Sequence, residues 1–284
     1  MPDFRPIVPS DAGLLSHYFN DSRSRCCDLT VGGTMMWRSY FGSECCVYGD
    51  SLIIRVNFYG DKAYVVPMGG DRMRALRAVA EDDPNPLFCV VSREDLGLLA
   101  GCFGSIGVTA HRESFDYLYL ASDMRDLPGK RFSGQRNHIN KFLSVCGDWS
   151  FRIIDPSDID DAERFIDAFH QSMSGLGAEE EQRSRCLVRH MAEYGCVGGM
   201  LTVGGAVCGV TVCEKIGDTC YIHVEKADRT VPGVYPMLFR EASRAFADCK
   251  YINREEDDGN EGLRTSKLSY HPVRLIRKYL VRPL

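Results

Sequence analysis

Long apolar runs are missing from this sequence of 284 residues: none approaches the length of a membrane span, and no charged-then-apolar segment opens the chain as a secretory signal does. An excess of positive charge is missing too, because 34 Lys and Arg residues face 39 Asp and Glu residues, for a formal net charge of −5. We therefore expect a soluble, cytoplasmic protein that is not a globally basic nucleic-acid binder, so that any RNA contact depends on a local basic patch.

Metal-ligand spacings are also absent from the sequence. The 13 cysteines, an odd number, contain no CxxC pair, and the 7 histidines form no HxxxH or HExxH pair. Free cysteine is among the most frequently buried residue types. We therefore expect reduced thiols that fill the core, and no metal site.

Two pairs of segments repeat within the chain. Phe4–Asp11 (FRPIVPSD) agrees with Phe151–Asp158 (FRIIDPSD) at Phe, Arg, Ile, Pro, Ser and Asp, and each segment precedes a helical pattern. Further on, Gly60–Tyr64 matches Gly217–Tyr221, each as the turn of a β-hairpin. Because the two matches come in the same order, they favour a tandem duplication over the alternative of a chance match.

The duplication predicts two domains, residues 1–148 and 149–284, and the second is the easier to interpret. Hydrophobic periodicity and Gly-rich turns predict the order strand, helix, helix, three strands, helix, strand, helix, strand. The expected elements are a helix to Ser172, a helix at 178–194, strands at 200–203, 206–215 and 219–226, a helix from Gly233, and closing strands at 251–254 and 273–281 around a further helix. This order resembles the GNAT acyltransferase fold. We expect an α+β protein of two tandem GNAT-like domains, each a mixed, mainly antiparallel sheet flanked by helices.

A concentration of charge follows the strand at 251–254. The acidic loop Glu255–Asp258 leads through Gly259 and Gly262 into a short helix that ends before Pro272. Such junctions between strand and helix are common ligand sites, because free N–H groups and variable loops meet there. The alternative is a solvated acidic turn.

The segment 129–143 predicts a helix with an inner stripe of Phe132, Ile139, Phe142 and Leu143. Arg136 lies beside this stripe. A guanidinium taken out of water favours a carboxylate, so we expect Arg136 to form an ion pair with the acidic loop. Such an ion pair would either join the two domains or belong to a substrate contact, and both alternatives stay open.

These two motifs resemble the phosphatidylglycerol lysyltransferase C-terminal domain family. The resemblance is carried by residues 126–130 (DLPGK), 136–142 (RNHINKF), 253–257 (NREED), Gly259 and 262–272 (GLRTSKLSYHP). It implies a tandem GNAT fold, in which the best-known relatives move an aminoacyl group from charged tRNA onto a lipid head group. Those relatives carry a membrane-spanning half, and no such stretch occurs in this sequence, so the acceptor stays open between a small molecule and a lipid head group.

The leading hypothesis is an enzyme, an acyltransferase that uses aminoacyl-tRNA. Such a reaction needs a carboxylate to remove the acceptor proton, donors for the developing oxyanion and positive charge for the donor's phosphates. The candidates in that order are Glu255, Asp257 and Asp258; Lys267 and Tyr270; and Lys130, Arg131, Arg136, Asn137 and Lys141. Tyr270 fits the core equally well. A second basic group, Arg274, Arg277, Lys278 and Arg282, is either a further phosphate contact or the charged protection of an edge strand.

Two other functions stay open. A coenzyme-A-dependent N-acetyltransferase would hold a pyrophosphate at the start of the helix after the three strands, where Arg229 and Gly233 occur but Pro232 removes an N–H donor. The acyl donor is therefore aminoacyl-tRNA or acyl-coenzyme A, with no cofactor assigned. A non-catalytic binding protein is the third possibility, since ionisable residues also gather in structural networks.

Overall fold

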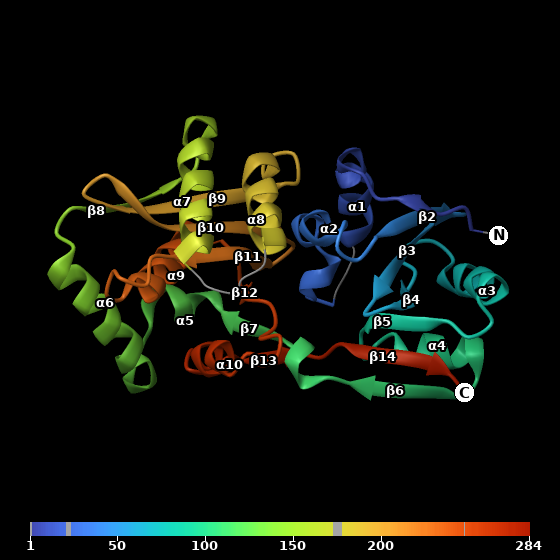
Figure 1. Ribbon diagram of the computed structural model, residues 1–284. Coiled ribbons are helices and arrows are strands. Elements are labelled where there is room, and N and C mark those ends of the chain that lie inside the picture. The colour runs from blue at the N-terminus through green and yellow to red at the C-terminus, as the bar shows by residue number, and fades with distance from the viewer. Residues whose placement is uncertain (1, 21–23, 173–177, 247) are drawn as a thin grey trace. The chain divides into compact units, whose positions relative to one another are not determined.

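The computed structural model describes all residues except 1, 21–23, 173–177 and 247, and its element order repeats once along the chain (Figure 1). The strands of the first repeat are β1 (Arg5–Pro6), β2 (Glu44–Tyr48), β3 (Ser51–Phe58), β4 (Asp61–Val65), β5 (Leu87–Val91), β6 (Ile106–Ala110) and β7 (Asp116–Leu120). Those of the second are β8 (Trp149–Ile153), β9 (Cys196–Val203), β10 (Ala206–Ile216), β11 (Thr219–Ala227), β12 (Tyr251–Asn253), β13 (Arg274–Ile276) and β14 (Tyr279–Pro283).

Of the helices that the structure describes, the first four of the first repeat correspond in order to the four of the second, and two more follow them in the first repeat. The first repeat holds α1 (Ala12–Phe19), α2 (Val31–Trp37), α3 (Arg72–Asp82), α4 (Leu96–Phe103), α5 (Ala121–Asp126) and α6 (Ser133–Val145). The second holds α7 (Ile159–Ser172), α8 (Ala178–His190), α9 (Val234–Ala245) and α10 (Glu261–Leu268). Short 3-10 turns are η1 (Pro9–Asp11), η2 (Cys27–Leu29), η3 (Arg112–Ser114), η4 (Lys130–Phe132) and η5 (Pro156–Asp158). The helices and strands expected for the second repeat are confirmed, with ends that differ by a few residues, up to the last strand.

The described strands form two sheets of seven, in the orders β1-β2-β3-β4-β5-β14-β6 and β13-β7-β12-β11-β10-β9-β8. The pairs β4–β5 and β11–β12 are parallel, and the other pairs with an assigned register are antiparallel. Read from opposite ends, the two orders correspond element by element. The predicted α+β fold of two mixed, mainly antiparallel sheets flanked by helices is therefore confirmed.

The last strand of each repeat belongs to the other repeat's sheet. Strand β14 lies between β5 and β6, where Figure 1 shows it in red among strands coloured blue to green, and β7 lies between β13 and β12. The chain consequently divides into unit 1 (Met1–Asp116, Glu256–Glu261 and Leu275–Leu284) and unit 2 (Tyr117–Glu255 and Gly262–Arg274). A cut after residue 148 thus separates the sequence repeats but not the compact units.

The single closing strand expected at 273–281 is wrong. Its residues form two strands, β13 in the second sheet and β14 in the first. Strand β14 pairs with β5 on one side and β6 on the other, so it is not an edge strand protected by charge. Its Val281 packs in the core of unit 1 with residues such as Phe88 and Leu76.

The matching octapeptides build the same turn in both units. In the first, the Arg5 guanidinium donates to both Asp11 oxygens at 2.8 and 2.6 Å, and in the second Arg152 pairs with Asp158. These guanidinium hydrogen bonds hold the pKa of both carboxyl groups below the usual range. Equivalent positions that make equivalent contacts support a duplication over a chance match.

Strand β10 is buried without interruption from Cys208 to Glu214, which is typical of a strand covered on both faces. Helix α7 contacts β10 and packs against α8, while α9 contacts β10 and packs against α5 and α6. All 13 cysteines are described and are free thiols, and all but Cys102 and Cys186 are buried, as expected. Among the described helices, none is both long and apolar enough to cross a membrane.

Candidate functional site

Three of the four carboxylates of the acidic loop have charged partners, and the fourth, that of Asp258, is exposed. The chain passes from unit 2 to unit 1 between Glu255 and Glu256. Four consecutive charged side chains each have a partner within their own unit: Arg254 with Glu225, Glu255 with His223, Glu256 with Lys278, and Asp257 with Arg112. A loop in which three of the four carboxylates are paired has a defined geometry, which a hydrated turn does not need.

In unit 2, an imidazole lies between two carboxylates. His223 Nε2 is 3.1 Å from Glu214 Oε2, and His223 Nδ1 is 2.8 Å from Glu255 Oε1. The register of β10 on β11 shifts between Val212 and Cys213, whose partners are Val224 and Ile222, so His223 is the extra residue of a β-bulge. Bulges re-aim a side chain while the ladder continues on either side.

The ring of His223 carries a positive charge at neutral pH. Burial alone would lower its pKa, but the hydrogen bonds and charges of Glu214 and Glu255 outweigh burial and raise the pKa to about 10. The result is a buried imidazolium that orients both carboxylates.

Glu255 itself is fixed but not enclosed. Its backbone is left-handed (φ 57°), and its N–H donates to the side chain of buried Asn253 at 2.7 Å. A left-handed non-glycine residue persists only where the surroundings hold it. The side chain is 24% exposed, and Oε2 has no hydrogen-bond partner in the described part of the chain. One oxygen is therefore anchored and the other is open.

Behind Glu255 lies an aromatic and cationic layer. Arg254 donates to Glu225 at 2.9 to 3.1 Å, and its guanidinium carbon lies 4.0 Å from the Phe239 ring centre and 5.2 Å from that of Tyr270. Lys267 Nζ donates to the Arg254 carbonyl at 2.6 Å. Tyr270 is buried, which raises its pKa. Of the two predicted oxyanion donors, Lys267 thus holds the backbone of the loop and Tyr270 packs in the core. A catalytic role for either residue stays a prediction.

In unit 1, the ammonium of Lys278 is surrounded by carboxylates. It lies 2.7 Å from Asp116, 2.5 Å from Asp28 and 3.1 Å from Glu256, and 3.4 Å from the Cys27 thiol. Burial raises the pKa of Asp116 to about 6, although Lys278 opposes the shift. Lys278 is buried and is therefore not the phosphate contact that the sequence suggested for the tail.

The remaining acidic candidates have separate positions. Asp257 is fully buried, and its Oδ2 accepts from Arg112 at 3.1 Å. Asp258 is exposed, and its pKa is raised by partial burial and by Glu256 and Asp257. Neither has the combination of an anchored and an open oxygen that Glu255 has.

Within unit 2, the predicted ion pair between Arg136 and the acidic loop is wrong among the described residues, because Arg136 does not pair with Glu255. The guanidinium donates instead to the Leu127 carbonyl at 2.5 Å and the Gly129 carbonyl at 2.7 Å. Both residues have a left-handed backbone, with φ values of 47° and 76°. Because Arg136 is only half-buried, two carbonyl oxygens suffice as partners. Leu143, placed on the inner stripe, is 40% exposed.

Other donor-site candidates lie on the surface of unit 2. Lys130, Asn137 and Lys141 are exposed on η4 and α6, and Arg131 pairs with Asp123 at 2.6 Å. Arg229 is exposed in the loop before α9.

Gly233 begins α9 under close packing. Its φ is 76°, and a Cβ at this position would lie 2.0 Å from the His138 carbonyl oxygen of α6. The N–H of Val234 donates to the Val231 carbonyl, and Pro232 and Pro236 have no N–H. Few free donors are left at this helix start.

Sequence reasoning missed His223 and Glu214, and it named Lys278 only as one of the basic residues of the tail, without its acidic partners. The sequence did carry one indication for His223 and Glu214, since a polar residue within a buried apolar strand needs a hydrogen-bond partner. His223 follows Tyr221-Ile222 and precedes Val224, and Glu214 ends the buried run of β10.

Comparison with solved structures gives a 31% identical match, with a TM-score of 0.93 over 100% of both chains, to a conserved protein of unknown function from Bacteroides thetaiotaomicron. The C-terminal domain of a putative lysylphosphatidylglycerol synthetase from Agrobacterium fabrum is 13% identical, with a TM-score of 0.69 over 98% of this chain and 93% of that one. The chain has a tandem GNAT-like fold.

Among curated proteins, an uncharacterized protein of Mycoplasmoides gallisepticum is 25% identical over 176 residues, which is 61% of this chain. The match covers 57% of that relative's length. The family model described as phosphatidylglycerol lysyltransferase, C-terminal, matches residues 19–282. A match over nearly the whole chain, together with the shared fold, shows that this protein belongs to the phosphatidylglycerol lysyltransferase C-terminal family.

Proposed function

We propose that this protein is an acyltransferase that moves an aminoacyl group from a charged tRNA to an amine or hydroxyl of a small molecule or lipid head group. The observation that carries the proposal is the Glu255 carboxylate, with one oxygen held 2.8 Å from His223 and the other open. Membership of a family described by a lysyl transfer supports an aminoacyl donor.

The reaction needs little covalent participation by the protein. The acceptor nitrogen or oxygen attacks the ester carbonyl, a new amide or ester bond forms, and the bond to the terminal ribose oxygen of the tRNA breaks. Glu255 takes the acceptor's proton and returns it to the ribose oxygen, which leaves as a hydroxyl. Fixed geometry is what makes such a base efficient, and His223 with Asn253 supplies it.

The start of α9 supports tRNA over coenzyme A as the donor. A pyrophosphate at a helix start needs free N–H groups and close access to the backbone. Here Pro232 and Pro236 have no N–H, and the carbonyl of His138 packs against Gly233. A tRNA needs only separated positive charges along a surface, which Lys130 and Lys141 offer.

Glu255→Gln is expected to lower kcat/KM for aminoacyl transfer by about 10²- to 10⁴-fold, the usual contribution of a general base. The amide keeps the size of the side chain but cannot take the proton. The measurement is transfer of a labelled aminoacyl group from charged tRNA to a lipid extract and to a panel of amines. Glu261→Gln, an exposed carboxylate on α10, serves as the control and should retain wild-type rates. Equal rates for the two variants would remove Glu255 as the base.

Binding to tRNA is expected to weaken steeply as salt rises, because phosphate contacts release counterions. In Lys130→Ala with Lys141→Ala, the slope of log K against log salt should be shallower by roughly one to two. Arg164→Ala with Lys250→Ala removes two exposed positive charges elsewhere on unit 2 and should keep the wild-type slope. Absence of binding at low salt, or identical slopes in all three proteins, would leave acyl-coenzyme A as the better donor.

A further inference from the structure

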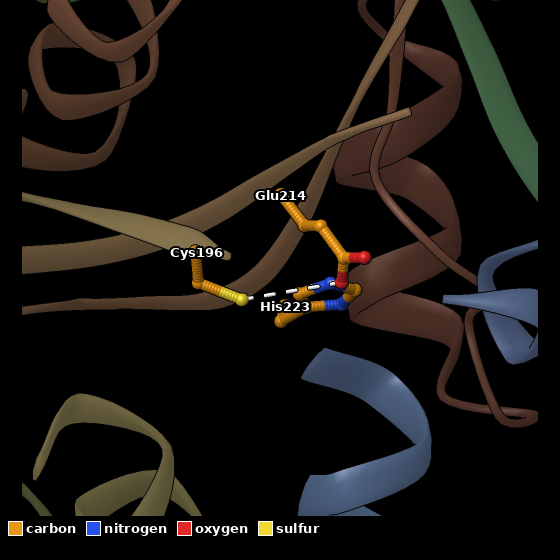
Figure 2. A group of neighbouring side chains, drawn as sticks. All are labelled: Cys196, Glu214 and His223. Carbon is orange, nitrogen blue, oxygen red and sulfur yellow. Dashed lines mark hydrogen bonds and ion pairs between the residues drawn. The ribbon is translucent and has the colours of Figure 1, made fainter. Parts of the chain in front are cut away.

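We propose that Cys196, Glu214 and His223 form a zinc-binding site in unit 2. A thiol sulfur, a carboxylate oxygen and a ring nitrogen lie within 4.8 Å of one another, and all three side chains are buried. Figure 2 shows the three side chains converging from neighbouring strands. Thiolate and imidazole are ligands that favour zinc over magnesium or calcium.

The sheet holds these ligands in place. Cys196 of β9 and Glu214 of β10 are direct cross-strand partners, so their side chains leave the sheet on the same face. His223 reaches them from β11 because it is the extra residue of the bulge. Three adjacent strands therefore supply one ligand each, and none depends on a flexible loop.

The distances suit a tetrahedral ion. Cys196 Sγ is 3.9 Å from Glu214 Oε2, and His223 Nε2 is 3.1 Å from the same oxygen. With zinc–ligand bonds of about 2.0 to 2.3 Å, tetrahedral ligand atoms lie about 3.3 to 3.8 Å apart. For these two pairs, shifts of a few tenths of an ångström would accommodate the ion, and the thiol sulfur and the ring nitrogen of the third pair lie within 4.8 Å of each other. Three protein ligands leave a fourth position for water or substrate.

Glu255 supplies the outer contact that metal-binding histidines usually have. A ligating imidazole donates its other N–H to a carboxylate or carbonyl, which fixes the ring. His223 Nδ1 is 2.8 Å from Glu255 Oε1, so this contact is already formed. The ion would replace two protons, one from the Cys196 thiol and one from the imidazolium, and both would pass to solvent.

A second group in unit 1, Cys27, Asp116 and Glu256, has comparable ligand spacing. Its centre is already taken, because Lys278 Nζ lies 3.4 Å from the thiol and 2.7 and 3.1 Å from the two carboxylates. A divalent ion there would face a buried ammonium. The three side chains of the unit 2 group themselves bring no fixed positive charge, only a removable proton on His223.

The test is cobalt and zinc titration of the untagged, chelator-treated protein. We expect one equivalent of Co²⁺ to bind, with a thiolate-to-cobalt charge-transfer band that one equivalent of Zn²⁺ removes. Cys196→Ser should lose this band and weaken zinc binding by about 100-fold or more, beyond the roughly 10- to 100-fold loss expected for the outer-contact variant Glu255→Gln.

Cys213→Ser is the matched control, because Cys213 is also a buried thiol and is the residue next to Glu214 on β10. It should bind cobalt as the wild type does. The proposal is overturned if the wild type binds neither ion at one equivalent, a result that needs no variant to fold, or if Cys196→Ser and Cys213→Ser titrate alike. Neither readout depends on transferase activity.

Discussion

Lys278→Met is expected to lower the free energy of unfolding by about 3–5 kcal/mol, the usual cost of removing one partner from a buried ion pair. The ammonium of Lys278 lies within 3.1 Å of Asp28, Asp116 and Glu256, and Asp116 is fully buried. Methionine fills most of the same volume, so the loss measures the uncompensated carboxylates and not a cavity.

The free energy of unfolding that Lys278→Met loses should grow as pH rises. The pKa of Asp116 is raised to about 6 from its ordinary value of 3.8, so between these values the folded state binds more protons than the unfolded state. Stability from this group is therefore present at low pH and is lost as pH rises through the folded-state pKa. Without Lys278 the pKa of Asp116 rises further, so the deficit of the variant should be larger at pH 7.5 than at pH 5.

Urea unfolding followed by circular dichroism at the two pH values measures both effects. Arg277→Met is the control, since Arg277 is the adjacent residue and is exposed. Its cost should stay within about 0.5 kcal/mol, as for most surface substitutions. A Lys278→Met protein as stable as this control, or a deficit independent of pH, would contradict the account of the cluster.

Gly233→Ala is expected to destabilise the protein by about 2–4 kcal/mol. The backbone of Gly233 is left-handed, with φ at 76°, and the added Cβ would lie 2.0 Å from the His138 carbonyl oxygen. A backbone oxygen cannot rotate away, so α6 and α9 would have to separate.

Gly205→Ala distinguishes the two causes. Gly205 has a φ of 79°, but a Cβ there would meet nothing within 4 Å. This variant should lose only the left-handed cost of about 1–2 kcal/mol. Equal losses from both substitutions, measured by the same unfolding experiment, would mean that α6 does not press on the start of α9. The excess in Gly233→Ala is thus a direct measure of how closely α6 packs on the start of α9.

Much of the fold was predictable because local patterns carry it. The strand expected at 206–215 is β10 (Ala206–Ile216), and the helix expected from Gly233 is α9 (Val234–Ala245), because hydrophobic period and Gly turns mark such elements. The octapeptide repeat indicated the duplication because Arg5 and Asp11 close the same turn as Arg152 and Asp158 in the second repeat.

The candidate site was only partly predictable. Glu255 stood out as a charge beside a strand end, but its partner His223 is 32 positions away and its role depends on a bulge. The partners of Arg136 could not be inferred, because backbone carbonyls occur at every residue and the left-handed turn at Leu127 has no strong sequence signal.

The sequence by itself determined the element order, the repeat, the reduced and mostly buried cysteines and the position of the acidic loop, because periodicity, turn residues and composition act over a few residues. Only the tertiary structure decided that β7 and β14 change sheets, and that Cys196, Glu214 and His223 meet. Strand pairing uses backbone hydrogen bonds that nearly every residue can make. Which strands pair is therefore set by the packing of the whole unit, and the sequence of the strand alone does not indicate its neighbour.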